Sequence, residues 1–161
     1  MLKYSYDASG NLAILSEAGV VPPQITGQPI RQILEPDEVA TFSVVVSDAS
    51  GATFQWKFNT TDIAGATGDS LLLTNVSAAN EGQYSVVVTN SAGNVTSDPA
   101  ALLLDSDRDG LPDSWEIANF GNTTSQRSAG DADGDGVTNS DEFYDGTNPN
   151  SSTSLRPRLI A

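Results

Sequence analysis

One twelve-residue pattern occurs twice in the C-terminal third of the chain. The first copy, DSDRDGLPDSWE, runs from Asp105 to Glu116, and the second, DADGDGVTNSDE, runs from Asp131 to Glu142. Each copy has acidic side chains at positions 1, 3 and 5, a glycine at position 6 and a glutamate at position 12. Alternate side chains on a tight loop point toward one centre, and the glycine allows the sharp turn. The pattern therefore predicts two loops that each enclose a hard cation.

Calcium is the cation that fits this spacing best, because it takes roughly six to eight oxygen ligands at about 2.3–2.6 Å. Magnesium fits less well, since it demands near-octahedral geometry and keeps several waters. We predict two Ca²⁺ ions, held by side chains at positions 1, 3, 5, 9 and 12 and by the main-chain carbonyl at position 7. The predicted ligands are Asp105, Asp107, Asp109, Leu111, Asp113 and Glu116 in the first loop and Asp131, Asp133, Asp135, Val137, Asn139 and Glu142 in the second.

A solvated acidic linker is the alternative interpretation, but it would not require the glycine and the glutamate in both copies. Position 8 of the first copy is Pro112, which has no N–H to donate to a strand between paired loops. The residues before each loop lack helical periodicity, so we expect a helix only after each loop, at Ser114–Asn119 and Ser140–Tyr144. We expect the aromatic and apolar side chains of this region to form its core rather than a ligand platform; they are Trp115, Ile117, Phe120, Phe143 and Tyr144.

Residues 105–149 resemble the calcium-binding repeats similar to thrombospondin type 3 repeats that occur in large bacterial surface and secreted proteins. The stretch DADGDGVTNSDEFYDGTNP, after the first copy, carries this resemblance, and it is also similar to dockerin. The resemblance implies a stiff structure built around bound calcium. Two departures from dockerin argue against cohesin-type docking. Both copies have Glu at position 12, where dockerins usually have Asp, and no clear aliphatic recognition helix follows the second copy.

The chain has a formal net charge of −14 over 161 residues and contains no cysteine or histidine. Residues 105–150 hold 11 of the 21 acidic side chains and 2 of the 7 basic ones, so the charge concentrates around the two loops. The absence of a basic patch argues against nucleic acid or an anionic membrane as a partner. No apolar run approaches the roughly 18 residues that predict a membrane span.

Residues 20–104 show short alternating runs separated by turn residues, which predicts an antiparallel β-sandwich. The predicted strands are Ile30–Leu34, Val39–Val46, Ala52–Phe58, Ser70–Val76, Gly82–Thr89 and Asn94–Leu104. The last strand leads directly into Asp105, so we expect a rigid junction with the first loop.

Trp56 lies 12 residues after Val44, and Tyr84 lies two residues before Val86. With these positions, residues 22–104 resemble an immunoglobulin-like domain of the I-set kind, with Trp56 on the core and a tyrosine corner at Tyr84. Where this family often has an inter-sheet disulfide, the chain has Val44 and Val86. The resemblance therefore implies that apolar packing around Trp56 replaces the cross-link.

The N-terminal residues 3–15, KYSYDASGNLAIL, predict a strand, a turn and a second strand. The motif YxYDxxGNL within them resembles the YD (Rhs) repeat of large bacterial shell-forming proteins. A chance hairpin is the alternative. One hairpin cannot bury its own face, so we expect this one to lean on the next domain and to have no separate activity.

These observations predict a mainly β protein, with an immunoglobulin-like antiparallel β-sandwich and a small loop-helix calcium-binding module. We expect a YD-repeat-like hairpin at residues 1–19, the sandwich at 20–104, the calcium module at 105–149 and a polar tail at 150–161. The expected function is a non-catalytic structural or adhesion module, a rigid spacer in a larger bacterial protein. Calcium loops of this type fill where calcium is abundant, which favours secretion or the cell surface. We expect a monomer that contacts neighbouring domains of the parent polypeptide or another surface protein.

Three alternatives remain open. A dockerin-like, calcium-dependent protein-binding module is disfavoured because loop positions 10 and 11 differ between the copies, Ser114-Trp115 against Ser140-Asp141. Carbohydrate binding by the sandwich lacks a row of exposed aromatic residues. Catalysis lacks the common bases and nucleophile pairs, which leaves only a glycosidase-type carboxylate pair or an isopeptide bond from Lys57 to an asparagine.

Overall fold

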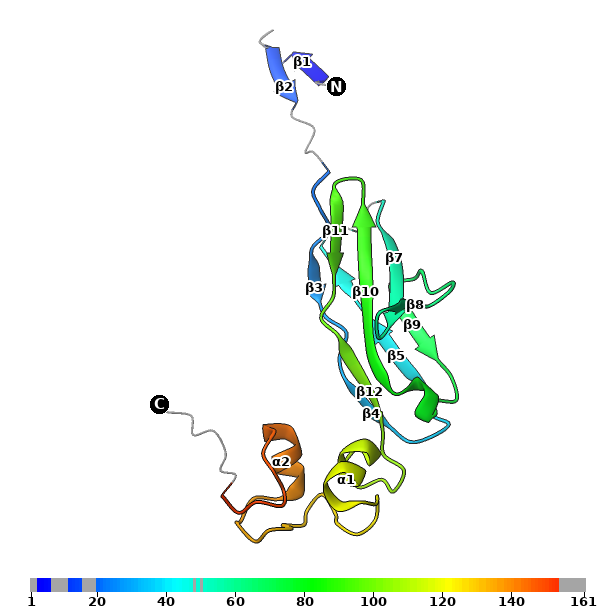
Figure 1. The fold of residues 1–161 in the computed structure, drawn as a ribbon. Helices are drawn as coiled ribbons and strands as arrows, with labels where there is room; N and C mark the ends of the chain where they lie inside the picture. Colours follow the sequence, from blue (N-terminus) through cyan, green and yellow to red (C-terminus); the bar gives the residue numbers. More distant parts are fainter. Residues whose placement is uncertain (1–2, 7–11, 16–19, 48, 50, 154–161) are drawn as a thin grey trace.

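The computed structural model describes residues 3–6, 12–15, 20–47, 49 and 51–153. The N-terminal hairpin consists of β1 (Lys3–Tyr6) and β2 (Leu12–Leu15), which pair antiparallel. Both strands agree with the predicted hairpin, and its turn lies outside the described residues. A β-sandwich and two short helices follow (Figure 1).

One sheet of the sandwich has the strand order β4-β12-β10-β7-β8, with β11 also paired to β10. The other layer contains the pairs β3-β6 and β5-β9. All pairs are antiparallel except β4 with β12, which run parallel. The strands are β3 (Ile25–Gly27), β4 (Gln32–Leu34), β5 (Ala40–Ser43), β6 (Val45–Val46), β7 (Thr53–Phe58), β8 (Thr61–Asp62), β9 (Ser70–Leu73), β10 (Gly82–Asn90), β11 (Gly93–Thr96) and β12 (Ala100–Leu104).

Each of the six predicted runs contains a strand, but two runs are divided. Val39–Val46 forms β5 and β6, and Asn94–Leu104 forms β11 and β12. At the second break the Ser97 hydroxyl accepts a hydrogen bond from the Val86 N–H (3.0 Å), and Pro99 has no N–H to continue the ladder. The short strands β3 and β8 were not predicted, because two or three residues carry too little alternation to be recognised.

Trp56 of β7 is fully buried at the centre of the sandwich core. Its ring lies 6.3 Å from that of Phe42 in β5, and Phe42 in turn stacks on Tyr84 of β10 at 4.7 Å between ring centroids. The Trp56 indole N–H donates to the Gly68 carbonyl (3.0 Å), so the buried polar atom of this side chain is satisfied. These contacts confirm the predicted core position of Trp56.

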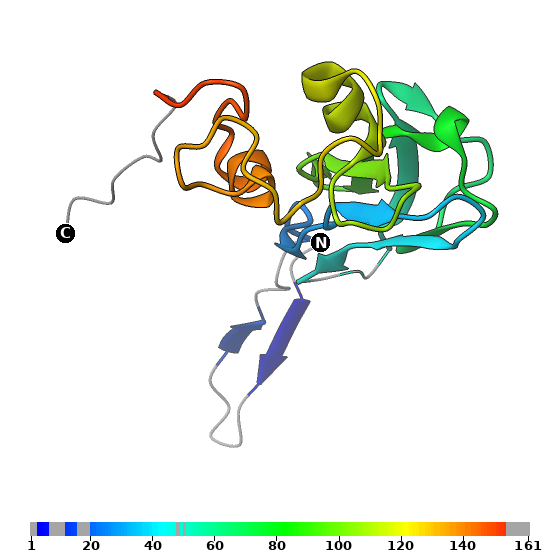
Figure 2. The same ribbon diagram turned by 90° about the horizontal axis from the view of Figure 1, so that it is seen from below.

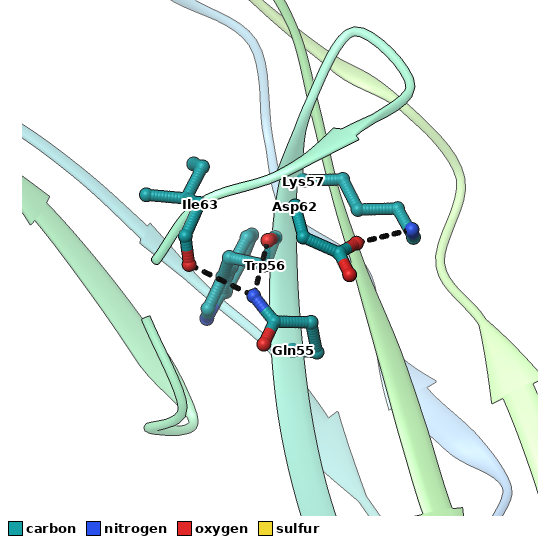
Figure 3. Close-up of polar contacts among 5 residues, drawn as sticks. All are labelled: Gln55, Trp56, Lys57, Asp62 and Ile63. Carbon is teal, nitrogen blue, oxygen red and sulfur yellow. Dashed lines mark hydrogen bonds and ion pairs between the residues drawn. The ribbon is translucent and has the colours of Figure 1, made fainter. Parts of the chain in front are cut away.

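The side chains beside Trp56 on β7 make polar contacts with β8 and the residue after it (Figure 3). The Gln55 amide donates to the carbonyls of Trp56 (2.8 Å) and Ile63 (2.9 Å), which fastens this edge of the sheet. Lys57 forms an ion pair with Asp62. Lys57 therefore faces away from the core, as its alternation with Trp56 predicts, and this weighs against an isopeptide bond inside the sandwich.

Val44 and Val86 belong to the same buried apolar cluster, where a related domain would carry its disulfide. The Tyr84 hydroxyl donates to the Asn80 carbonyl (2.8 Å), four residues upstream, which is the geometry of a tyrosine corner. Apolar packing therefore takes the place of a cross-link at Val44 and Val86, and the hydrogen bond fixes Tyr84 to the turn before β10.

The strand β12 ends at Leu104, and the first acidic loop begins at the next residue. Helix α1 (Asp113–Phe120) follows the first loop and α2 (Asn139–Asp145) follows the second, each ended by a left-handed glycine, Gly121 or Gly146. Both helices lie beyond the end of the sandwich where β4 and β12 finish (Figures 1 and 2). The residues directly before each loop are not helical, as predicted, because β12 leads into the first loop and residues 121–130 lead into the second without a helix.

None of the helices in the described ranges combines the length and the hydropathy that crossing a membrane requires.

Two apolar side chains of the helical region that were predicted to lie in its core point outward instead. Ile117 is 56% exposed and Tyr144 is 60% exposed. The aromatic contacts instead connect Trp115 with Phe120 (5.5 Å) and with Phe143 (5.7 Å), both edge to face. The buried side chains of the two helices are those of Glu116, Asn139 and Glu142, so residues of the acidic loops occupy the inward positions of these short helices.

Candidate metal centre

The first loop brings three carboxylates together at the end of the sandwich. Asp105, Asp107 and Asp109 each offer an oxygen, and these oxygens all lie within 4.8 Å of one another. Asp105 is buried, because β12 delivers it directly from the sandwich core, and its N–H donates to the Leu34 carbonyl (2.9 Å). The position of the first predicted ligand is therefore fixed by strand pairing between β4 and β12.

Asp105 also organises the loop around itself. Its carboxylate accepts hydrogen bonds from the N–H groups of Arg108 (2.8 Å), Asp109 (3.2 Å) and Gly110 (2.8 Å). Gly110 has a φ of 93°, in the region that only glycine adopts without strain. The predicted reason for glycine at position 6 is confirmed by this backbone geometry.

The second loop repeats the arrangement. Asp131, Asp133 and Asp135 again place oxygens within 4.8 Å of one another. The Asp131 carboxylate accepts from Gly134 (2.7 Å), Asp135 (3.2 Å) and Gly136 (2.9 Å), the same three loop positions as in the first copy. Two stretches 26 residues apart in the sequence therefore fold into one local structure because they share one spacing of residue types.

The two loops differ at position 4, where both backbones are left-handed. The second loop has Gly134 there (φ 78°), and the first has Arg108 (φ 67°). A non-glycine residue in this region costs on the order of 1 kcal/mol. The Arg108 guanidinium forms an ion pair with Glu35 of the sandwich. This contact offsets part of the cost of the left-handed backbone at Arg108.

The burial of the glutamates at position 12 is the strongest indication that each loop binds a positive charge. Glu116 and Glu142 are fully buried, and neither carboxylate oxygen of either residue has a hydrogen-bond partner among the described residues. One oxygen of Asp133 and one of Asp135 are buried and unpartnered in the same way. Burying ionised carboxylates without partners costs several kcal/mol each, so these groups require a cation or protons.

The pKa values of these carboxyls in the ion-free protein reflect the same strain. The pKa of Glu116 is raised to about 7, first by burial and then by the repulsion of the aspartates in its loop. Burial and the loop aspartates also raise the pKa of Glu142, and the nearby Thr147 side chain offsets this in part. The pKa of Asp131 is lowered, chiefly because its carboxylate accepts the Gly136 N–H.

The donor set fits a hard divalent cation. Carboxylate oxygens from positions 1, 3 and 5 converge in each loop, and these are the ligands that calcium prefers. The glutamates at position 12 stay predicted ligands, and a dication would neutralise the buried glutamate of each loop. The predicted carbonyl ligands come from residues beside the cluster. The Leu111 N–H donates to Asp109 (2.9 Å), and the Val137 N–H donates to Asp135 (2.8 Å). Their carbonyls stay predicted ligands.

The predicted ligands at position 9 have structural partners within their own loops. Asp113 accepts from both the N–H (2.8 Å) and the hydroxyl of Ser106, which is position 2. Asn139 accepts from the N–H of Ala132, also position 2 (3.3 Å). These side chains therefore connect position 9 with position 2 of each loop, a role that the sequence spacing did not indicate. Their direct contact with calcium stays a prediction.

Contacts among the described residues join the loop region to the sandwich, and their sandwich partners could not be recognised from the sequence. The Leu34 carbonyl accepts from Asp105, and Glu35 pairs with Arg108. Arg31 lies over the rings of Phe143 (5.1 Å) and Tyr144 (5.2 Å) in α2. Arg31, Leu34 and Glu35 all belong to β4 or its flanks, and no local pattern marks them, because their partners lie more than 70 residues away.

Comparison with known proteins identifies the sandwich. Residues 22–90 match the family model described as immunoglobulin domain. The strand order, the buried Trp56 and the tyrosine corner agree with that match, so this part of the chain is an immunoglobulin-like domain. Such domains are generally non-catalytic structural modules and typically sit in multidomain proteins, and no enzymatic family is indicated.

Several solved structures are similar to this chain. Tandem Ig repeats of Dlar align at 20% identity with a TM-score of 0.48, over 52% of this chain and 48% of that one. The N-terminal Ig1-2 module of the Drosophila receptor protein tyrosine phosphatase DLAR aligns at 19% identity with a TM-score of 0.49, over 55% and 49%. A titin domain aligns at 22% identity with a TM-score of 0.47, over 53% and 96%. This chain thus spans about half the length of the Dlar structures. No curated protein sequence matches it significantly.

Proposed function

We propose that this chain is a non-catalytic structural or adhesion module in which two Ca²⁺ ions hold a helical unit rigidly against the end of an immunoglobulin-like domain. The observation that carries the proposal is the pair of buried glutamates, Glu116 and Glu142, which lack hydrogen-bond partners among the described residues. Each lies in a loop whose aspartates at positions 1, 3 and 5 converge. Bound calcium would supply the positive charge that both carboxylates require.

The direct connection between the sandwich and the first loop supports a rigid junction. No linker separates β12 from the first loop, and the Leu104 N–H is held by the Glu81 carboxylate (2.9 Å) just before the chain enters the loop. The second helix contacts the sandwich through Arg31. A cation above an aromatic ring contributes about 0.5–1 kcal/mol when exposed, and an exposed ion pair about 0.2–1 kcal/mol. Each contact is weak by itself, so the junction depends on calcium keeping both loops folded.

The proposal places the sandwich at residues 20–104 and the calcium module at 105–149, within a larger bacterial protein that is secreted or displayed on the cell surface. Calcium affinity tests the location. Extracellular calcium modules bind with dissociation constants of about 10⁻⁴–10⁻³ M, whereas cytosolic sensors bind at about 10⁻⁷–10⁻⁵ M. Dissociation constants in the sensor range would contradict the extracellular assignment and leave the structural role standing.

A calorimetric calcium titration of chelator-treated protein, combined with thermal melts, tests the function itself. The chain has two tryptophans, so the variant Trp115→Phe leaves Trp56 as the fluorescent reporter of the sandwich alone. We expect a stoichiometry of two and a higher sandwich melting temperature with calcium. An ion that binds only the folded state adds about 4 kcal/mol at a thousandfold excess over its dissociation constant.

Three outcomes are informative. Two ions and a raised Trp56 melt support the rigid spacer. Two ions with an unchanged Trp56 melt mean that the calcium unit is tethered and independent, which would favour a dockerin-like role in binding a partner. No heat of binding and no change in melting with calcium would overturn the proposal.

A further inference from the structure

The two acidic loops are connected through the main chain of Ser128, which lies between them in the sequence. The Ser128 N–H donates to the Asp109 carboxylate (2.6 Å), at position 5 of the first loop. The Ser128 carbonyl accepts from the Ser140 N–H (2.9 Å), in the first turn of α2. A single residue therefore contacts one loop through its donor and the helix of the other loop through its acceptor.

The segment around Ser128 is fixed against the second loop by further hydrogen bonds. The Asn139 side chain donates to the Arg127 carbonyl (2.9 Å), and the Asn139 N–H donates to the Gly130 carbonyl (2.7 Å). Asn139 is fully buried. Gly130 is packed so closely that a Cβ on it would lie 3.0 Å from the Arg127 carbonyl oxygen. Residues 127–130 therefore form a template on which the start of α2 is held.

This template connects ligands of both loops. Asp109 contributes an oxygen to the first carboxylate cluster, and its carboxylate also accepts the Ser128 N–H. At the far side of the template, α2 carries Glu142, the buried carboxylate of the second loop. The Trp115 ring of α1 also packs edge to face on Phe143, the residue after Glu142. Ordering Asp109 thus orders the segment that positions Glu142.

Paired calcium loops can be joined by a short strand, but the described residues between 105 and 149 contain only the two helices and no strand. Pro112 lacks the N–H that such a strand would use. The Ser128 main chain and the ring contact between Trp115 and Phe143 are therefore routes by which one loop can affect the other. Two sites that share an ordering step bind with a coupling free energy that is reciprocal.

We propose that the two loops bind calcium with positive cooperativity, and that the main chain of Ser128 transmits the coupling. This inference rests on the proposed calcium binding and adds to it the residue that links the sites. Filling either loop orders residues 127–130 and so lowers the ordering cost that the other loop must meet. Coupling between sites of this kind typically changes affinity by about 5–150-fold, and we expect a factor of at least 5.

A calorimetric binding cycle measures the coupling. The variant Glu142→Gln leaves the first loop alone, and Glu116→Gln leaves the second loop alone. The overall association constant of the unmodified chain for two ions, divided by the product of the two single-loop constants, is the coupling factor. We expect a factor of about 5 or more. A factor of one with two ions bound overturns the inference but leaves the calcium function intact, whereas no binding by the unmodified chain overturns both.

The variant Ser128→Pro tests the proposed link, because proline cannot donate a hydrogen bond to Asp109. Ser128→Ala is the matched control, since it keeps the N–H and the carbonyl and removes only a hydroxyl. We expect the coupling factor to fall toward one in Ser128→Pro and to persist in Ser128→Ala. An unchanged factor in Ser128→Pro overturns the assigned link. Circular dichroism with calcium shows whether α2 still forms in Ser128→Pro, and if it does not, the factor measured in the unmodified chain still decides whether the loops are coupled.

Discussion

The substitution Glu116→Gln should have opposite effects on stability with and without calcium. Glu116 is fully buried with both carboxylate oxygens unpartnered, so at pH 8 the ion-free protein holds a negative charge in an apolar, acidic setting. Glutamine has the same shape and no charge. Removing the charge should therefore stabilise the ion-free protein, while removing a charged ligand should weaken the calcium-loaded one.

The pKa of Glu116 sets the size of the first effect. A carboxyl whose pKa rises from 4.5 to about 7 on folding disfavours its ionised folded state by roughly 3 kcal/mol. Between these two values the folded ion-free protein binds more protons than the unfolded chain, so its stability falls as the pH rises through this window. The gain from Glu116→Gln should thus be largest, roughly 3 kcal/mol, above pH 7 and should vanish below about pH 5. With saturating calcium the sign reverses only if the loss of binding free energy exceeds this gain, so we expect calcium binding to weaken by more than roughly 150-fold, which is about 3 kcal/mol.

Thermal melts at pH 5 and pH 8, in chelator and in calcium, measure these four cases. The difference between fluorescence melts with Trp115 present and with Trp115→Phe reports the module, and calorimetry reports calcium binding. Asp69→Asn is the control, because Asp69 is an exposed carboxylate far from both loops in the sequence, and it should change neither melt. The reasoning would be refuted if Glu116→Gln destabilised the ion-free protein at pH 8, or if it left the calcium affinity unchanged.

Three further variants test other parts of the structure. Gly136→Ala should weaken calcium binding by about 1 kcal/mol or more, because φ at this position is 90°, and calorimetry would show no loss if the loop did not need glycine. Tyr84→Phe removes the hydrogen bond to the Asn80 carbonyl and should lower sandwich stability by about 1 kcal/mol in a denaturant melt, whereas Tyr144→Phe, on an exposed ring, should not. Val44→Cys with Val86→Cys should form a disulfide between two buried core positions and raise the free energy of unfolding by up to about 4 kcal/mol. Melts with and without reductant measure this gain, and failure of the bond to form would contradict the prediction.

The immunoglobulin-like fold could be predicted from a few residues whose roles are local. Trp56 and Tyr84 mark their strands because a buried tryptophan and a tyrosine corner recur at fixed places in such sandwiches, and both positions are confirmed. The strand ends were less predictable. The break between β11 and β12 depends on the Ser97 hydroxyl reaching Val86 on the neighbouring strand, a contact that alternation in one segment does not reveal.

In the helical region the sequence also predicted the elements better than the details of their packing. Its two helices begin one residue before the predicted starts and end one residue beyond the predicted ends. Ile117 and Tyr144 were predicted to be core residues but are largely exposed, because hydrophobic character alone does not decide which face of a short helix meets a neighbour. Tyr144 instead presents its ring to Arg31 of the sandwich.

The sequence by itself determined the two acidic loops, because their side chains come from consecutive residues and the backbone turn that gathers them needs only glycine at the right position. It also determined where the sandwich meets the first loop, since no residue separates Leu104 from Asp105. Only the tertiary structure decided that Glu116 and Glu142 are buried without partners and that Ser128 connects the loops. Those facts depend on packing between segments distant in the chain, and no local pattern encodes such packing.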